Sequence, residues 1–409
     1  MDLTRGEKEK ILKKVSELVE KKHFNPKLNG ADWPALVRSH TSQILSTESP
    51  ELFEKEMQEL LSQLKTSHTG FFHRSARNIP ARLAINATVE KLSINGDEVW
   101  MFRDVQEGGA GAAARIEPGD IIVACGGKRI RPPAPVVFKM GEPAALTLRK
   151  LDGREVLASL NVPAPRDRKH PVSQPKSIVL SRLADGVGLI KANMFPGTVG
   201  IDVARETDEA FHQLRDCERL IIDLRGNTGG GIGGLRLMSY LTPERIPVGY
   251  SLTKGRAAKG YEKEKLPRFG RIPSSRAALI WLALRYGFID KSIVVVTEGL
   301  GPKKFHGHIA ILVNQHTASA AEIVSAFAQE NGLATIVGER TAGRLLSGTA
   351  FKVGHGYMLG LPVAAYLTWK GRTIEGTGVT PDVTVDLPYE SLKAGRDDQL
   401  SKALQLGSQ

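Results

Sequence analysis

Apolar side chains in the first part of the chain recur at the spacing of one face of a helix. This spacing occurs within residues 11–19 and again within residues 52–64. The second stretch stops at residues 66–70, where Thr, Ser and Gly cluster as they do in turns. The pattern predicts an N-terminal helical region over residues 1–78.

The pattern changes to short runs rich in Val, Ile and Leu after residue 79, with turn residues between the runs. Such runs are typical of strands. They occupy residues 98–105, 120–125, 144–150 and 155–162. We therefore expect a β-rich domain over residues 79–165. The polar, Pro-bearing stretch 164–171 that follows is predicted to be a linker.

Strand-like and helix-like patterns alternate over residues 166–409. The predicted strands are 186–192, 219–224 and 308–314, and the predicted helices are 202–214, 235–241 and 320–331. This alternation is typical of a layered α/β core. Residues 252–305 are rich in Lys and Arg and fit the alternation poorly, so we interpret them as a basic insertion over one face of the core.

Composition narrows the possible functions. The chain has 409 residues, 41% of them hydrophobic, and a net charge of +12. No apolar run reaches the length of a membrane span, and the charged N-terminus lacks a signal-peptide core, so a cytoplasmic protein is expected. Cys125 and Cys217 stand alone, which argues against a metal site, and no cofactor is expected. Basic stretches interleaved with aromatic residues are not visible, so nucleic acid is not an expected partner.

The clearest candidate for chemistry is Ser319. A buried strand ends before it, a short turn follows, and a helix begins directly after it. Free amides at the start of a helix, with the helix dipole, can stabilise a developing oxyanion. The same serine also forms a capping box with Glu322, which is the common structural reason for a serine at this place.

A Gly-rich turn follows the predicted strand 219–224. Glycines here let the backbone approach a ligand closely. Gly229-x-Gly231-x-x-Gly234 matches the dinucleotide-binding fingerprint, but that site also needs an acidic residue after the next strand. The next predicted strand, 246–252, ends in Thr-Lys-Gly. We therefore favour an oxyanion-binding turn, and a nucleotide-binding enzyme remains an alternative.

Several ordered motifs together are similar to those of the C-terminal-processing (tail-specific) and tricorn-core serine peptidases. The motifs are Asp-Leu-Arg-x-Asn-x-Gly-Gly at 223–230, Thr-Ala-Ser-Ala-Ala-Glu at 317–322, Val-Gly-Glu-Arg-Thr-Ala-Gly at 337–343 and Gly-Thr-Gly-Val-Thr-Pro-Asp at 376–382. Residues 108–122 resemble part of a PDZ domain. The resemblance covers roughly residues 60–385. It implies an α/β core of the crotonase/ClpP-like type with an inserted PDZ-like domain.

One position departs from the tail-specific branch of that family. Arg344 stands where the branch has its catalytic lysine, and a guanidinium stays protonated and cannot accept a proton. In the tricorn branch a His before the PDZ domain is the base and a late Glu orients it. His68 and Glu375 resemble those two residues.

The resemblance implies peptide-bond hydrolysis through an acyl-enzyme. Ser319 would attack the carbonyl, His68 would take the proton, and Glu375 would orient His68. The amide of Ala320 and an amide of Gly229 or Gly230 would hold the oxyanion. The candidate partners are a peptide or protein substrate, bound through its C-terminus, and further copies of the chain in a homo-oligomer. A catalytically silent ligand-binding module of the same fold is the other alternative.

Overall fold

The structure is a computed structural model of the chain. It describes residues 3–75, 78–164, 176–183, 186–196, 200–273, 278 and 292–406. The polypeptide divides into two compact units, each built from three separate segments. Unit 1 comprises residues 1–76, 242–301 and 343–378, and unit 2 comprises residues 77–241, 302–342 and 379–409.

This division differs from the expected linear order of domains. Residues 242–301 and 343–378 were expected within the core, but they group with the N-terminal helices. The basic segment 252–305 is also more than an insertion, since it contributes strands β14 (Arg268–Phe269) and β15 (Val294–Val296) to the sheet of unit 1. Residues 274–277 and 279–291 of that segment, and the expected linker beyond Ala164, lie outside the described residues.

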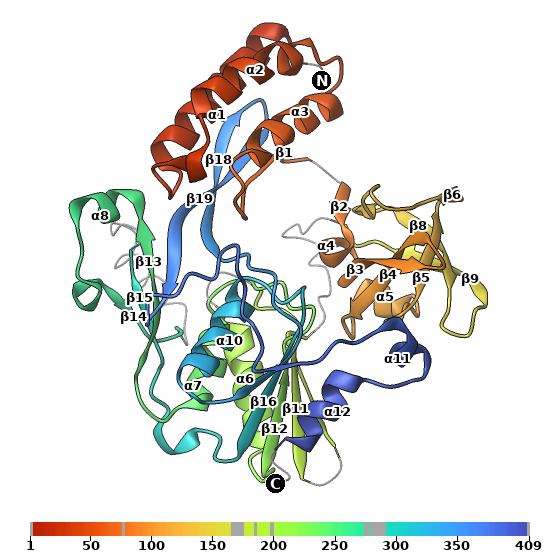
Figure 1. Cartoon of the computed structure of the whole chain (residues 1–409), viewed down its shortest axis with the longest axis vertical. Helices are drawn as coiled ribbons and strands as arrows, with labels where there is room; N and C mark the ends of the chain where they lie inside the picture. Colours follow the sequence, from red (N-terminus) through yellow and green to blue (C-terminus); the bar gives the residue numbers. More distant parts are fainter. Residues whose placement is uncertain are drawn as a thin grey trace. The chain divides into compact units, whose positions relative to one another are not determined.

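Unit 1 is organised by a six-stranded sheet with the order β1-β19-β13-β15-β14, in which β18 also pairs with β19. The long hairpin of β18 (Leu346–Gly354) and β19 (Tyr357–Thr368) forms its centre, as Figure 1 shows in blue. The first strand, β1 (Gly70–His73), pairs with β19, and so does β13 (Pro247–Thr253). The chain segment just before β1 is thereby held beside the β18–β19 hairpin.

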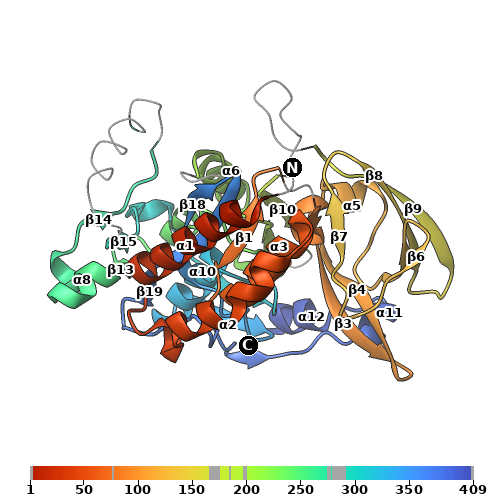
Figure 2. The same cartoon turned by 90° about the horizontal axis from the view of Figure 1, so that it is seen from above.

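Three helices cover this hairpin: α1 (Arg5–Lys22), α2 (Trp33–Ser46) and α3 (Pro50–Ser62) (Figures 1 and 2). The residue before each helix caps it, because its side chain accepts a hydrogen bond from a backbone amide of the first turn. These residues are Thr4, Asp32 and Ser49. Their apolar stripes enclose a common core with strands β1, β18 and β19. The largest side chains of this core include Trp33, Phe53, Phe71 and Tyr357.

The α/β part of unit 2 is built on a second six-stranded sheet, ordered β10-β11-β12-β16-β17-β20. Strand β10 (Ile178–Arg182) runs antiparallel, and the other strands are parallel to one another. They are β11 (Val187–Ala192), β12 (Arg219–Asp223), β16 (His308–Val313), β17 (Thr335–Gly338) and β20 (Val383–Thr384). The carboxyl ends of β12 and β16 meet at one edge of this sheet.

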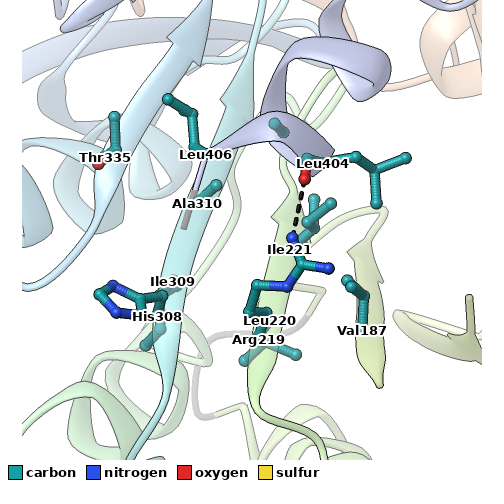
Figure 3. Close-up of a pocket in the computed structure, with 11 residues that line it drawn as sticks. Val187, Arg219, Leu220, Ile221, His308, Ile309, Ala310, Thr335, Leu404 and Leu406 are labelled. Atoms are coloured by element: carbon teal, nitrogen blue, oxygen red, sulfur yellow. Dashed lines mark hydrogen bonds between the residues drawn. The ribbon is translucent and has the colours of Figure 1, made fainter. Parts of the chain in front are cut away.

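Helices cover both faces of this sheet. On one side lie α6 (Ile201–Gln213), α7 (Gly234–Leu241) and α10 (Ala320–Glu330), and on the other lies α12 (Asp398–Gln405) (Figure 1). A small cavity of about 50 Å³ remains beneath α12. Figure 3 shows Arg219 donating a hydrogen bond to the Leu404 carbonyl there, at 2.8 Å. This bond ties the C-terminal helix to β12.

The β-rich domain of unit 2 contains a separate antiparallel sheet, ordered β3-β4-β5-β8-β9. Its strands are β3 (Ala87–Ile94), β4 (Asp97–Val105), β5 (Ile121–Cys125), β8 (Pro143–Arg149) and β9 (Glu155–Asn161). Two short helices, α4 (Ala81–Ala84) and α5 (Ala110–Ala113), complete it. The four strands predicted in this stretch are confirmed to within a residue at each end. The α/β character of the chain is confirmed as well.

Candidate active site

Ser319 lies between the end of β16 and the first residue of α10, as the sequence predicts. Its backbone has φ 55° and ψ −120°. A serine that only caps a helix has an extended backbone. The backbone conformation of Ser319 is rare, and it costs a residue other than glycine about 1–3 kcal/mol. Strain of this kind at a strand-to-helix turn exposes a nucleophilic hydroxyl in α/β hydrolases. The backbone therefore presents Ser319 as more than a helix cap.

The buried carboxylate of Glu322 stabilises the turn that contains Ser319. Its Oε2 accepts the Ser319 backbone N–H at 2.9 Å, and its Oε1 accepts the Thr341 hydroxyl at 2.6 Å. The Thr341 hydroxyl oxygen in turn accepts the Val379 amide at 2.7 Å. Glu322 is thus a part of the scaffold under Ser319, and it fixes the residue in its strained conformation.

The Gly-rich turn after β12 lies directly against Ser319. A Cβ on Gly229 would come within 2.5 Å of the Ser319 Cβ and 2.8 Å of the Ala320 nitrogen, and Gly229 has φ +90°. Only glycine satisfies both conditions. The two segments that the sequence singled out are therefore brought together by the fold.

The amides of this turn are not equivalent. The Gly229 N–H donates to Asn227 Oδ1 at 2.8 Å, and the Gly231 N–H donates to the Phe195 carbonyl at 2.7 Å. Within the described part of the chain, the Gly230 and Ala320 amides have no such acceptor. Of the two glycines expected to donate to an oxyanion, Gly229 is therefore already engaged and Gly230 is available.

The same contacts speak against a dinucleotide cradle. A phosphate site needs several amides of the Gly-rich turn to point at the ligand. Here two of them bond to the protein, and a Cβ on Gly230 would lie 2.0 Å from the Phe195 carbonyl oxygen. The Gly-rich turn is packed against the preceding loop, where a pyrophosphate would have to lie.

A polar network joins this turn to the β-rich domain. Asn314 accepts the amides of Gly226 and His316 with its Oδ1, at 3.1 and 3.0 Å, and donates through Nδ2 to Asp104 at 2.9 Å. Asp104 lies on β4 beside Arg103, whose guanidinium binds Glu339 at 2.5 Å. Strand β4 therefore contacts the loops that carry the Ser319 turn.

Unit 1 contains the second part of the predicted site. The Ser67 hydroxyl donates to Glu375 Oε2 at 2.7 Å and lies 2.8 Å from His68 Nδ1. Glu375 Oε1 accepts the Ser67 amide at 2.8 Å, and Oε2 also accepts the Leu345 amide at 2.8 Å. His68 and Glu375 are thus brought together, but the hydroxyl of Ser67 connects them.

This chain of bonds sets the tautomer of His68. Since Ser67 gives its hydrogen to the carboxylate, its oxygen can accept a proton only from His68 Nδ1. The other ring nitrogen, Nε2, is then unprotonated and can accept a proton from a substrate or a nucleophile. Burial lowers the pKa of His68 from its ordinary value, the charge of Glu375 opposes this, and the charge of Arg344 adds to the lowering.

Sequence reasoning missed two residues of this arrangement, Ser67 and Thr341. A serine directly before a candidate histidine is a weak signal, because turns are rich in serine. Thr341 lies within the motif Val-Gly-Glu-Arg-Thr-Ala-Gly at 337–343, whose pattern by itself predicts no role for the threonine hydroxyl. The contacts of both depend on strand pairing over long sequence distances, which a local pattern does not contain.

Comparison with known proteins agrees with these observations. Residues 186–385 match the family model described as Peptidase family S41. The chain is thus similar to peptidase family S41 over just under half of its length. The match spans the Gly-rich turn, the Ser319 turn and Glu375, so the resemblance expected from the motifs is confirmed.

Curated proteins that the chain matches include a processing protease and a tricorn protease homolog. A carboxyl-terminal-processing protease of Synechocystis sp. is 28% identical over 55% of this chain and 45% of its own length. Tricorn protease homolog 1 of Streptomyces coelicolor is 23% identical over 94% of this chain and 33% of its own length. The chain thus spans about half or less of these two relatives.

Among solved structures, the photosystem II D1 C-terminal processing protease matches with a TM-score of 0.58 and 17% identity, over 95% of this chain and 96% of that one. At this level of identity the match shows a shared mixed α/β fold. Among the described residues, no helix is both long and apolar enough to cross a membrane.

Proposed function

We propose that the chain is a serine endopeptidase in which Ser319 is the nucleophile, His68 is the general base and Glu375 orients His68 through Ser67. The observation that carries the proposal is the backbone of Ser319, at φ 55° and ψ −120°, with Gly229 and Ala320 packed against it. A strained turn of this kind is expected where a hydroxyl must be exposed for attack.

Hydrolysis would follow the acyl-enzyme route. The Ser319 Oγ attacks the scissile carbonyl carbon while His68 Nε2 takes its proton, and the oxyanion is held by the amides of Ala320 and Gly230. Breaking of the C–N bond releases the amine, which takes the proton back from His68. Water then attacks the acyl-enzyme carbonyl while His68 Nε2 takes a proton from it. His68 returns this proton to the Ser319 Oγ as the ester bond breaks, and the acid product is released. Acylation and deacylation therefore each begin with His68 neutral, and His68 carries the extra proton only between the attack and the breakdown of each tetrahedral intermediate.

The β-rich domain of residues 79–165 is proposed to be PDZ-like, and the α/β part of unit 2 to be of the crotonase/ClpP-like type. A β-sheet domain with two short helices, and the sequence resemblance at residues 108–122, support the first assignment. Such domains capture C-terminal carboxylates. We therefore propose that protein substrates bind in part through their C-termini, consistent with the names of the processing proteases that the chain resembles.

A fluorophosphonate probe tests the nucleophile directly. The wild-type chain should be labelled at Ser319 and should cleave peptides, whereas Ser319→Ala should lose both with a fold unchanged by circular dichroism. Loss of a triad nucleophile costs on the order of 10⁴-fold or more in rate, against about 1 kcal/mol of stability for loss of a cap. Peptidase activity retained by Ser319→Ala would show that Ser319 is a cap only.

A further inference from the structure

A groove of about 860 Å³ opens in unit 2 between the C-terminal half of α6 and residues 302–306. Its floor consists of aromatic rings. Phe211 and Tyr240 stack with centroids 4.1 Å apart and planes 5° apart, and Phe305 lies edge-on to Phe211 at 6.5 Å. Each of these side chains is only 5–7% exposed, so the rings are well packed.

The groove is separate from the Ser319 turn. Its residues Arg215 and Asp216 precede β12, and Phe305 and His306 precede β16, so it lies where these parallel strands begin. Ser319 follows the end of β16. A six-residue strand rises roughly 20 Å. A ligand in the groove therefore leaves the nucleophile free.

Cations dominate the rim of the groove. Arg215, Lys303 and Lys304 line it, and within the described part of the chain none of the three forms a close ion pair, although the charge of Arg215 also acts on the neighbouring Asp216. Arg215 lies 3.1 Å from a ring nitrogen of His212, and that ring cannot neutralise it. The fourth cation, Arg205, is paired with Asp202 at 3.0 Å.

Most of the carboxylates in the groove are already engaged. Asp208 accepts two bonds from Arg236, at 2.8 and 2.9 Å, and one from the Tyr240 hydroxyl at 2.8 Å. Asp216 is paired with Arg182 at 2.5 Å. Glu209 accepts a bond from the Gln213 amide and has no cationic partner in the described part of the chain. The field in the groove is therefore positive.

This combination selects an acidic peptide. An extended acidic peptide would place carboxylates against Arg215, Lys303 and Lys304 and apolar side chains on the aromatic floor. The volume is within the range of about 300–1,000 Å³ that is typical of ligand sites. A second copy of this chain fits poorly, because its net charge is +12.

We propose that the groove is an exosite that binds an acidic segment of the protein substrates. This inference rests on the proposed function for the identity of the partner as a substrate. Binding there would tether a substrate and raise its effective concentration near the nucleophile, which would increase kcat/KM for substrates that carry such a segment.

Binding can be measured without catalysis. The full-length chain with Ser319→Ala is titrated against a fluorescein-labelled peptide of alternating Glu and Phe, with anisotropy as the readout. The double charge reversal Lys303→Glu/Lys304→Glu should weaken binding about ten-fold or more. The matched control, Lys128→Glu/Arg129→Glu, changes the net charge equally at exposed positions of the β-rich domain and should leave the affinity unchanged.

Several results would overturn the proposal. These are equal weakening by the two double reversals, tighter binding of phosphatidylserine vesicles than of the peptide, or equal binding of a single-stranded oligonucleotide of the same charge. Fluorophosphonate labelling of the wild-type chain separates this inference from the proposed function. Peptide binding without labelling refutes the peptidase and leaves the groove, whereas labelling with unchanged peptide binding by the reversed variant refutes the groove.

Discussion

The hydroxyl of Ser67 donates a hydrogen bond of 2.7 Å to Glu375, across 308 positions of sequence. This bond orients the lone pairs of Ser67 toward His68 Nδ1. We predict that Glu375→Gln lowers kcat by about 10²- to 10⁴-fold with little change in KM, because the proton acceptor is then poorly oriented. Steady-state kinetics with a fluorogenic peptide measure this.

The matched control is Glu54→Gln. Glu54 lies in the same unit, is half-buried and accepts a backbone amide, that of His73 at 3.1 Å. It should keep wild-type kcat. If the two variants lose activity equally, Glu375 has only a structural role. Ser67→Ala should resemble Glu375→Gln, and wild-type activity in Ser67→Ala would refute the connection through Ser67.

The pH dependence of kcat/KM follows from the pKa of His68. The base must be neutral, so activity is lost as the pH falls through this pKa, and burial places it below the ordinary 6.5. Arg344 lowers the pKa and Glu375 raises it. Arg344→Gln should therefore move the acid limb to higher pH, and Glu375→Gln should move it to lower pH.

Lys352→Gln is the control for that pH experiment. It removes one positive charge from an exposed position of β18 in the same unit. The acid limb should stay where it is in the wild type. An acid limb that is unaffected by Arg344→Gln and by Glu375→Gln would mean that another group titrates.

Gly229→Ala should abolish labelling of Ser319. The added methyl would lie 2.5 Å from Ser319 Cβ and 2.8 Å from the Ala318 carbonyl oxygen, so the turn would have to shift. Gly126→Ala is the control, since Gly126 also has a positive φ but has open space around it. Both substitutions carry about 1–2 kcal/mol of backbone strain, and only Gly229→Ala adds a clash. Equal labelling of the two variants would contradict the close packing of Gly229 against Ser319.

Thr341→Val should reduce the free energy of unfolding by about 2–4 kcal/mol, because it leaves Glu322 and the Val379 amide with lost hydrogen bonds in a buried place. Denaturant titration measures the loss, and the fluorophosphonate rate should fall with it. Thr207→Val is the control, since that buried hydroxyl donates only to a helix carbonyl, that of Val203. A smaller loss for Thr341→Val than for Thr207→Val would contradict the supporting role of Glu322.

Local patterns predicted several elements of unit 2 closely but missed others, among them β3, β10 and α12. The predicted helices 202–214 and 320–331 correspond to α6 and α10 to within a residue, because amphipathic spacing and flanking Gly residues mark such elements. The candidate residues Ser319, His68 and Glu375 came from motifs, and their roles stay predictions. The Gly229 backbone packs against Ser319, and the oxyanion-binding role of this turn also stays a prediction.

The grouping of segments into units could not be predicted in this way. The hairpin of β18 and β19 belongs with the N-terminal helices because its apolar face fills their core, as Leu359 and Leu361 show. A binary pattern reports that a residue is buried but not which partner buries it. The engagement of the Gly229 amide by Asn227 also depends on turn geometry, which composition does not determine.

The pairing of β1 with β19 has a consequence for synthesis of the protein. The helices α1 to α3 leave the ribosome early, but the core that they enclose is completed only when Tyr357, Leu359 and Leu361 arrive. At about 5–20 residues per second, this delay is roughly 15–60 s. During that time Phe53, Met57 and Phe71 lack part of their native cover, so the nascent N-terminal region is the part of the chain that we expect molecular chaperones to bind.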